Sequence, residues 1–283
     1  MALDMSGKVC VVTGGSSGVG LAIARGCARN GATVALVSKD PRRGMEAAKT
    51  LRSETHNSEI EWLGADLSDF DSVRDLATRV IERYGAIHVL SNNAATISLN
   101  RRVSRQGFEL SFATNHLGHF HLTGLLLPAL SKGAPSRAIT VSGHPSTIRG
   151  ARLDFSNLML ERNYSLLRAT VNAAMARVLF TFELARRLEG RGITANTFHP
   201  GLVRSNLPSG LPWYLRLPGT LAMHALSREC PTGVFLASSP EVEATTGAIF
   251  VGRKPQSFAV PWDTREEARR LWDASEALVG QAV

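Results

Sequence analysis

The hydrophobic pattern of this chain alternates between two periods. Short apolar runs, which predict buried strands, are separated by longer segments with apolar residues every three or four positions, which predict helices. The predicted strands are Lys8–Thr13, Thr33–Ser38, Ile60–Ala65, Ala86–Asn92, Arg137–Ser142, Thr194–His199 and Gly247–Val251. Strands that alternate with helices in this way form a parallel sheet with helices on both faces.

The segments between these strands carry the signals of helix ends. Pro41 and Ser68 favour a helix start, and Gly85 favours a helix end. The predicted helices are Gly18–Asn30, Pro41–Thr55, Ser68–Tyr84, Gly107–Leu130, Arg168–Glu189 and Asp263–Val279. We therefore predict an α/β fold with a single Rossmann-fold domain over residues 1–283. Its core is a doubly wound parallel sheet of about seven strands.

Composition and charge narrow the class of protein without changing this fold. The longest apolar stretch, Leu122–Leu130, is interrupted by Gly124 and Pro128 and is too short to span a membrane. Met1–Lys8 lacks the basic and apolar regions of a signal peptide, so we expect a cytoplasmic protein. The net charge of +8 comes from scattered Lys and Arg residues, so neither nucleic acid nor a membrane is the expected partner.

Metals and oligomers leave weaker signals. The three cysteines have no metal-binding spacing, so we expect reduced thiols and no metal site. One apolar stripe of a predicted helix is consistent with either burial or a homodimer face. It comprises Leu122, Leu125, Leu126 and Ala129.

A glycine-rich loop follows the first predicted strand. It runs from Thr13 to Gly20 and leads directly into a predicted helix. Glycine lets the backbone turn tightly and approach a pyrophosphate, and the helix offers free N–H groups and its positive end. A strand, this loop and a helix in succession predict a dinucleotide site.

Several motifs in the right order resemble the short-chain dehydrogenase/reductase family. Thr13–Gly20 is similar to its TGxxxGxG loop, Asp66-Leu67 to its adenine contact and Asn92–Ala95 to its NNAG motif. Phe112–Phe120 resembles the retinol-dehydrogenase-like branch, and His199–Ser205 resembles the motif beside the nicotinamide. The resemblance implies a cofactor site formed by Gly14, Ser16, Ser17, Gly18, Val19, Gly20, Ser38, Lys39, Asp66, Leu67, Asn93, Ala94, Ala95, Pro200, Gly201 and Val203.

The end of the second predicted strand bears on which dinucleotide binds. Lys39 follows Ser38 directly, and Arg42 and Arg43 are close by. A cation here suits the 2′-phosphate of NADP(H), whereas NAD(H) usually meets an acid. Asp40 could approach the same ribose, and the basic residues could simply be a solvated helix start. We expect NADP(H) rather than NAD(H).

The family's proton-transfer residues are a Ser, a Tyr and a Lys, supported by an Asn. An ungapped match from Leu179 onward places Thr170 at the tyrosine position and Ala174 at the lysine position. Gly143 falls at the serine position, after Ser142, while Asn115 matches the asparagine. A threonine hydroxyl cannot replace a tyrosine whose pKa is lowered by an ammonium, so ordinary ketone reduction is not expected.

Other residues offer substitutes. Tyr164–Arg168 reads as YxxxR but lies six residues upstream, and Ser142 could serve as the missing serine or simply bond to the backbone. His144 lies two residues past Ser142 and is a candidate proton donor. The further candidates, each with a structural alternative, are Asn172, Arg177, His116 and His199.

Three functional hypotheses follow. The first is an atypical NADP(H)-dependent oxidoreductase that reduces an enone or quinone-like ring. The second is a non-redox enzyme on the same fold, such as a cyclase, isomerase or dehydratase, and the third is a cofactor-binding partner or sensor without catalysis. Residues 207–226 resemble a substrate lid whose apolar content predicts an apolar or aromatic small-molecule substrate, as in specialised metabolism; a packed loop is the alternative.

Overall fold

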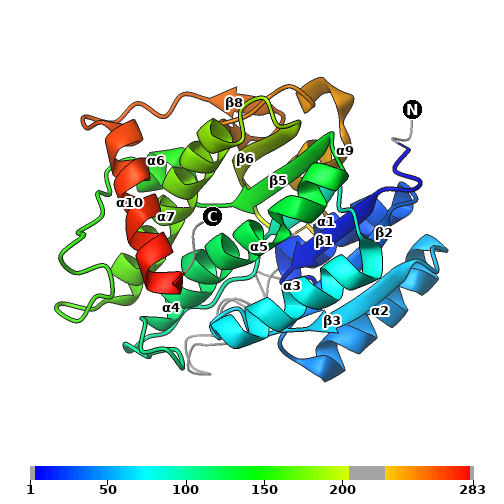
Figure 1. The fold of residues 1–283 in the computed structure, drawn as a ribbon, viewed down its shortest axis with the longest axis horizontal. Coiled ribbons are helices and arrows are strands. Elements are labelled where there is room, and N and C mark those ends of the chain that lie inside the picture. Colours follow the sequence, from blue (N-terminus) through cyan, green and yellow to red (C-terminus); the bar gives the residue numbers. More distant parts are fainter. Residues whose placement is uncertain (1–3, 204–226, 281–283) are drawn as a thin grey trace.

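A single sheet of eight strands forms the centre of the molecule (Figure 1). The structure is a computed structural model that describes residues 4–203 and 227–280. The strands are β1 Val9–Thr13, β2 Thr33–Ser38, β3 Ile60–Gly64, β4 Val89–Asn92, β5 Ser136–Val141, β6 Ile193–His199, β7 Ile249–Val251 and β8 Lys254–Gln256. Their order is β3-β2-β1-β4-β5-β6-β7-β8, and every pair is parallel except β7 with β8. This confirms the predicted Rossmann-type α/β domain, with an antiparallel edge strand that the apolar pattern did not reveal.

Helices cover both faces of the sheet, and the sheet separates two hydrophobic cores. The main helices are α1 Gly18–Arg29, α2 Pro41–Thr55, α3 Phe70–Tyr84, α5 Gly118–Lys132, α7 Leu166–Arg187, α9 Pro231–Ser238 and α10 Thr264–Val279. Apolar residues of α3, α5, α7 and α10 share one core, and those of α1, α2 and α9 share the other. Helix α9 was not predicted, because its eight residues are too few to show a helical period.

The fourth predicted helix, Gly107–Leu130, is more irregular than its sequence indicated. It begins at Leu110, where the Glu109 carboxylate accepts hydrogen bonds from the N–H groups of Ser111 and Phe112. After this turn, α4 Leu110–Phe112, a π-helical turn from Ala113 to Leu117 precedes α5. Such turns frequently mark functional sites, and this one contains Asn115.

The apolar stripe on α5 is buried inside this chain. Leu122 and Leu126 have no exposed surface, Ala129 is also buried in the core shared with α3 and α7, and Leu125 packs against this core but is only partly buried. Helix α10 lies against α7 (Figure 1). Trp272 of α10 stacks on Phe180 of α7. Burial inside this chain therefore accounts for three of the four stripe residues, and the stripe gives no support to a homodimer. Among residues 4–203 and 227–280, no helix is long and apolar enough to cross a bilayer.

The strand order creates a binding position at one edge of the sheet. The chain runs from β1 outward to β2 and β3, then crosses to β4 on the other side of β1. In open α/β sheets, ligands bind at such a reversal, beyond the carboxyl ends of the strands. The glycine loop follows β1, and the Asn93–Ala95 segment follows β4, so both lie at this position.

Candidate cofactor and active site

The glycine loop is packed too tightly for side chains at its key positions. Gly14 has a φ of +65°, and a Cβ there would lie 2.9 Å from the Cα of Ala94. A Cβ on Gly20 would lie 2.5 Å from the carbonyl oxygen of Gly14. Ser17 precedes α1, and its side chain makes no capping hydrogen bond. The first N–H groups of α1 therefore remain available to an anion, as a pyrophosphate site requires.

Thr13 links the start of this loop to the end of β4. Its Oγ1 accepts hydrogen bonds from the N–H groups of Asn93 at 2.8 Å and Ala94 at 3.1 Å. Its hydroxyl lies 2.9 Å from Nε2 of His119, whose Nδ1 lies 3.0 Å from the carbonyl of Asn115. A carbonyl only accepts, so Nδ1 carries the proton and Nε2 accepts from Thr13. Burial and the charge of Arg177 lower the pKa of His119 to about 3, which keeps it neutral.

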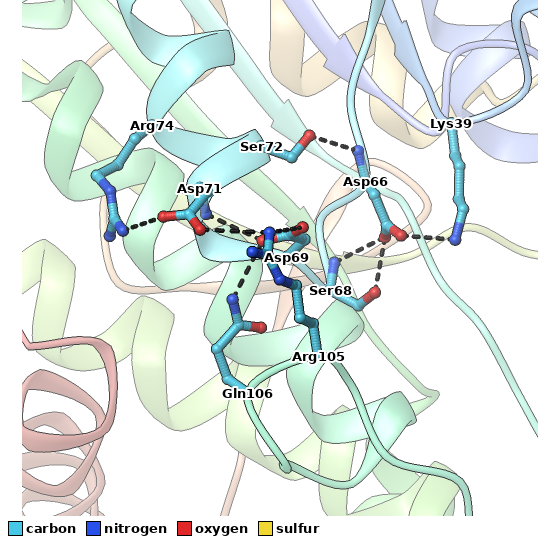
Figure 2. A network of polar contacts seen from close by, with 9 residues as sticks. All are labelled: Lys39, Asp66, Ser68, Asp69, Asp71, Ser72, Arg74, Arg105 and Gln106. Atoms are coloured by element: carbon cyan, nitrogen blue, oxygen red, sulfur yellow. Dashed lines mark hydrogen bonds and ion pairs between the residues drawn. The ribbon is translucent and has the colours of Figure 1, made fainter.

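Lys39 and Asp66 meet at the adenosine end of the site (Figure 2). Nζ of Lys39 lies 2.6 Å from Oδ2 of Asp66. Burial raises the pKa of Asp66, but hydrogen bonds from Lys39 and Ser68 outweigh it, so the pKa lies below its usual value. Asp40, which could have approached the ribose, instead caps α2 by accepting a hydrogen bond from the Arg43 N–H at 3.1 Å. That leaves a cation, not an acid, at the strand end.

The other residues of the predicted cofactor site lie along the same edge. Ser38 ends β2, where its hydroxyl accepts a hydrogen bond from the Trp62 indole at 3.0 Å, and Leu67 is buried after β3. Pro200, Gly201 and Val203 follow β6. The glycine cradle, the free start of α1 and the Lys39 ammonium together fit NADP(H). The residues that would hold it are Gly14, Ser16, Ser17, Gly18, Val19, Gly20, Ser38, Lys39, Asp66, Leu67, Asn93, Ala94, Ala95, Pro200, Gly201 and Val203.

The predicted serine and lysine positions lie side by side. A Cβ on Gly143 would lie 3.6 Å from the Cβ of Ala174. The hydroxyl of Ser142 donates to the carbonyl oxygen of Ala174 at 2.8 Å and is buried there. Thr170 lies one turn before Ala174 and is exposed, with its hydroxyl donating to the Leu166 carbonyl at 2.8 Å. Both hydroxyls are thus engaged by backbone carbonyls.

Arg177 is buried one turn after Ala174, and its guanidinium forms hydrogen bonds with backbone carbonyls. Its guanidinium donates to the carbonyl oxygens of Asn115 at 2.6 Å, Val141 at 3.2 Å and Ala94. Burial lowers its pKa to about 9. The sequence signal was present, because one charged residue interrupts the apolar run Ala173–Phe180, but nothing in the sequence showed which carbonyls it binds.

The Asn115 side chain is also committed to backbone. Its Oδ1 accepts from the N–H of Thr96 at 2.8 Å, and its Nδ2 donates to the Thr96 carbonyl at 3.0 Å. Its own carbonyl receives hydrogen bonds from both Arg177 and His119. A carbonyl oxygen has two lone pairs, so both are occupied.

Two imidazoles lie at the carboxyl ends of β5 and β6. The rings of His144 and His199 meet edge to face, with centroids 5.1 Å apart and an interplanar angle of 86°. Nδ1 of His144 accepts from the N–H of Ser146, which places its neutral-form proton on Nε2. Burial and the nearby His144 lower the pKa of His199, whose Nδ1 is buried and has no hydrogen-bond partner among the described residues.

Two further candidate proton-transfer residues, Tyr164 and His116, form hydrogen bonds with other segments. The hydroxyl of Tyr164 donates to the carbonyl of Ser98 at 2.6 Å, and burial raises its pKa. His116 is buried, and its Nε2 lies 2.8 Å from the Ser275 hydroxyl on α10. Both contacts tie separate segments together.

A cavity of about 430 Å³ adjoins the Gly143 position. Thr147 lines it, and the Oγ1 of this residue lies 3.7 Å from where a Gly143 Cβ would be. Its lining combines apolar residues, which include Leu160, Leu167 and Val171, with polar ones, which include Asp154, Arg168 and Asn172. The predicted lid, 207–226, lies outside the described residues.

Comparisons with known proteins agree with one another. A family model described as short chain dehydrogenase matches residues 8–153. Human retinol dehydrogenases 13 and 14 are each 35% identical, over 97% and 98% of this chain and 85% and 87% of their own lengths. A crystal structure of an uncharacterised protein from Mycobacterium paratuberculosis matches with a TM-score of 0.74 and 29% identity, covering 99% of this chain and 96% of its own. The NADP complex of Pseudomonas aeruginosa RhlG has the same fold, with a TM-score of 0.67 at 24% identity over 88% of this chain and 96% of its own.

Proposed function

This chain belongs to the short-chain dehydrogenase/reductase family, and on that premise we propose that it is an NADP(H)-dependent oxidoreductase with an atypical proton-transfer site. The single observation that carries the proposal is that Gly143 and Ala174 lie next to each other, since a Cβ on Gly143 would lie 3.6 Å from the Cβ of Ala174. With these two residues, the family's serine and lysine positions carry neither a hydroxyl nor an ammonium. Thr170, at the tyrosine position, is exposed, and its hydroxyl donates to the Leu166 carbonyl. The intact glycine cradle supports cofactor binding despite these losses.

The hydrogen bonds of Arg177 and His119 support this departure from the family mechanism. In the family, the asparagine holds a water that relays protons. Here both lone pairs of the Asn115 carbonyl are taken, one by Arg177 and one by His119. Arg177 thereby places a fixed positive charge beneath the site without presenting a proton donor at the missing lysine's position.

We assign the contact with the substrate oxygen to His144. NADPH, when bound, supplies the hydride. Because Nδ1 of His144 accepts from Ser146, the neutral ring presents its Nε2–H as a donor. A neutral imidazole can polarise a carbonyl without transferring its proton. The proton that completes a reduction then comes from water or from the substrate itself, which favours an activated acceptor such as an enone or quinone-like ring over a simple ketone.

The cavity and the relatives both support an apolar or aromatic substrate. The apolar residues that line the cavity would contact a ring or chain, and its polar residues would bind oxygen substituents. Relatives named retinol dehydrogenase are 35% identical over nearly the whole chain, and retinol is largely apolar. The unusual site and the apolar content of residues 207–226 favour a substrate of specialised metabolism.

One experiment separates the three hypotheses. The purified protein is given NADPH and a panel of simple ketones, enones and quinones, and cofactor absorbance is followed with product. We expect NADPH loss in step with product for enones or quinones, and little with simple ketones. Vigorous reduction of simple ketones would overturn the proposal. Product without NADPH loss would indicate a non-redox enzyme, and cofactor binding with no product from any substrate would indicate a sensor.

A further inference from the structure

The Lys39–Asp66 ion pair holds the cation expected to bind a 2′-phosphate. The Lys39 side chain is 76% exposed and that of Asp66 is 28% exposed, and their charged atoms are 2.6 Å apart. Figure 2 shows the lysine reaching across from the end of β2 to the carboxylate after β3. A phosphate that binds Lys39 must therefore share this cation with a carboxylate or draw it away.

Asp66 is the fixed partner of the pair. Its Oδ1 accepts hydrogen bonds from the Ser68 N–H at 3.0 Å and the Ser68 hydroxyl at 2.7 Å. Its own N–H donates to the Ser72 hydroxyl at 3.0 Å. The Lys39 side chain, by contrast, is largely exposed and has a flexible four-carbon stem. When the ion pair breaks, we therefore expect the lysine to move rather than the aspartate.

The neighbouring charges do not replace this pair. Asp40 is engaged by Arg43, which lies 3.5 Å from it and also donates its N–H. Asp69 faces Arg105 and Gln106 on the far side of the network in Figure 2. Asp66 is thus the only carboxylate within ion-pair distance of Lys39 among residues 4–203 and 227–280.

We propose, on the premise of the cofactor site described above, that Asp66 sets the preference between NADP(H) and NAD(H) by competing with the 2′-phosphate for Lys39. NAD(H) has a neutral 2′-hydroxyl and leaves the ion pair intact. NADP(H) gains the lysine but loses the pair, so its advantage over NAD(H) is smaller than a free lysine would give. Asp66 is a specificity-determining residue in this sense, in addition to any contact with adenine.

The test measures binding of the cofactors alone, by titration calorimetry of the full chain with NADP⁺ and NAD⁺. Any adenine contact is common to both dinucleotides, so it cancels in the ratio of their dissociation constants. Asp66→Asn removes the competing charge and should raise the preference for NADP⁺ roughly two- to fivefold, the range of an exposed ion pair. Lys39→Gln should lower the preference.

A double variant separates competition for Lys39 from direct repulsion of the phosphate. Once Lys39→Gln is present, adding Asp66→Asn should leave the ratio unchanged. Asp69→Asn is the matched control, because it removes a nearby carboxylate that does not touch Lys39, and it should have little effect. A ratio that is unchanged in Asp66→Asn, or that still rises in the double variant, would overturn the proposal.

These outcomes are independent of the proposed reaction. Failure to turn over enones or quinones leaves the cofactor ratios as they are, and a failed ratio test leaves the reaction untouched. If the Asp66→Asn protein does not fold, the same ratio of dissociation constants is measured for Lys39→Arg. A guanidinium can bind Asp66 and a phosphate at once, so this variant should also raise the preference for NADP⁺; an unchanged or lower preference would contradict the competition.

Discussion

At the scale of single residues, the proposed active site has small side chains at the positions that the family resemblance assigns to reactive ones. Gly143 and Ala174 are close enough for their Cβ positions to be in van der Waals contact. The hydroxyl of Ser142 cannot donate to a substrate without giving up its hydrogen bond to the Ala174 carbonyl. A serine at Gly143 and a lysine at Ala174 would project into the space that these small residues leave open. A tyrosine at Thr170 would lie at the exposed surface of the helix.

Restoring those side chains tests this view directly. Gly143→Ser, Thr170→Tyr and Ala174→Lys together should introduce NADPH-dependent reduction of simple ketones, measured as initial rate, by a factor of roughly 10² or more. The new serine would meet Cγ2 of Ile148, which lies 2.8 Å from the added Cβ and must shift. As a control, Ala174→Met replaces Ala174→Lys in the triple variant, keeping the length without the charge, and should lose most of the gain. Equal rates for both triple variants would contradict the assignment.

At the scale of elements, the π-helical turn and α5 carry two buried histidines. Burial and the Arg177 charge lower the pKa of His116 and of His119 to about 3 in each case. Both are therefore neutral in the folded protein at pH values where an unfolded chain, with a histidine pKa of 6.5, takes up protons. Proton uptake by the unfolded state then lowers stability as pH falls from 6.5 toward 3.

Acid sensitivity should accordingly fall when one of these histidines is removed. Each contributes a loss of about 2 kcal/mol in the free energy of unfolding between pH 8 and pH 5. His116→Gln keeps a donor for Ser275 but does not titrate, so urea unfolding at the two pH values should show that much less difference. Ser275→Ala, which removes the same contact but no imidazole, should leave the difference between the two pH values as it is in the parent. A His116→Gln protein as acid-sensitive as the parent would count against a neutral, buried His116.

At the scale of the whole molecule, α10 closes the face formed by α5 and α7. Trp272 packs edge-on against Phe120 at 4.9 Å and stacks on Phe180 at 6.0 Å. The guanidinium of Arg187 lies 4.4 Å over its ring, and its indole N–H donates to Glu276 at 2.8 Å. A helix at the end of the chain thereby completes the core that the central helices leave open.

Removing this one side chain should measure the contribution of α10. Trp272→Ala should lower the free energy of unfolding by roughly 3–5 kcal/mol, because it leaves a cavity between α5, α7 and α10. If the substitution exposes apolar surface of this core, sedimentation of the Trp272→Ala protein should also show self-association. Trp262→Ala is the matched control, since Trp262 is only partly buried and should cost less than half as much. Equal losses for the two variants would mean that α10 is not a structural cover.

The sequence by itself determined the α/β order, the strand positions and the glycine loop, because each depends on local hydrophobic period and on backbone freedom within a few residues. The resemblance to the family pattern from Leu179 onward also predicted Gly143, Thr170 and Ala174 at the serine, tyrosine and lysine positions. Only the tertiary structure decided what lies against them: Ser142 against the Ala174 carbonyl, Arg177 on three carbonyls and Lys39 on Asp66. These contacts join residues up to 83 positions apart, as from Arg177 to Ala94, and no local pattern encodes them. The same holds for the apolar stripe on α5. Its periodicity predicts that one face of the helix is covered, but only the packing of the whole chain shows which elements cover it.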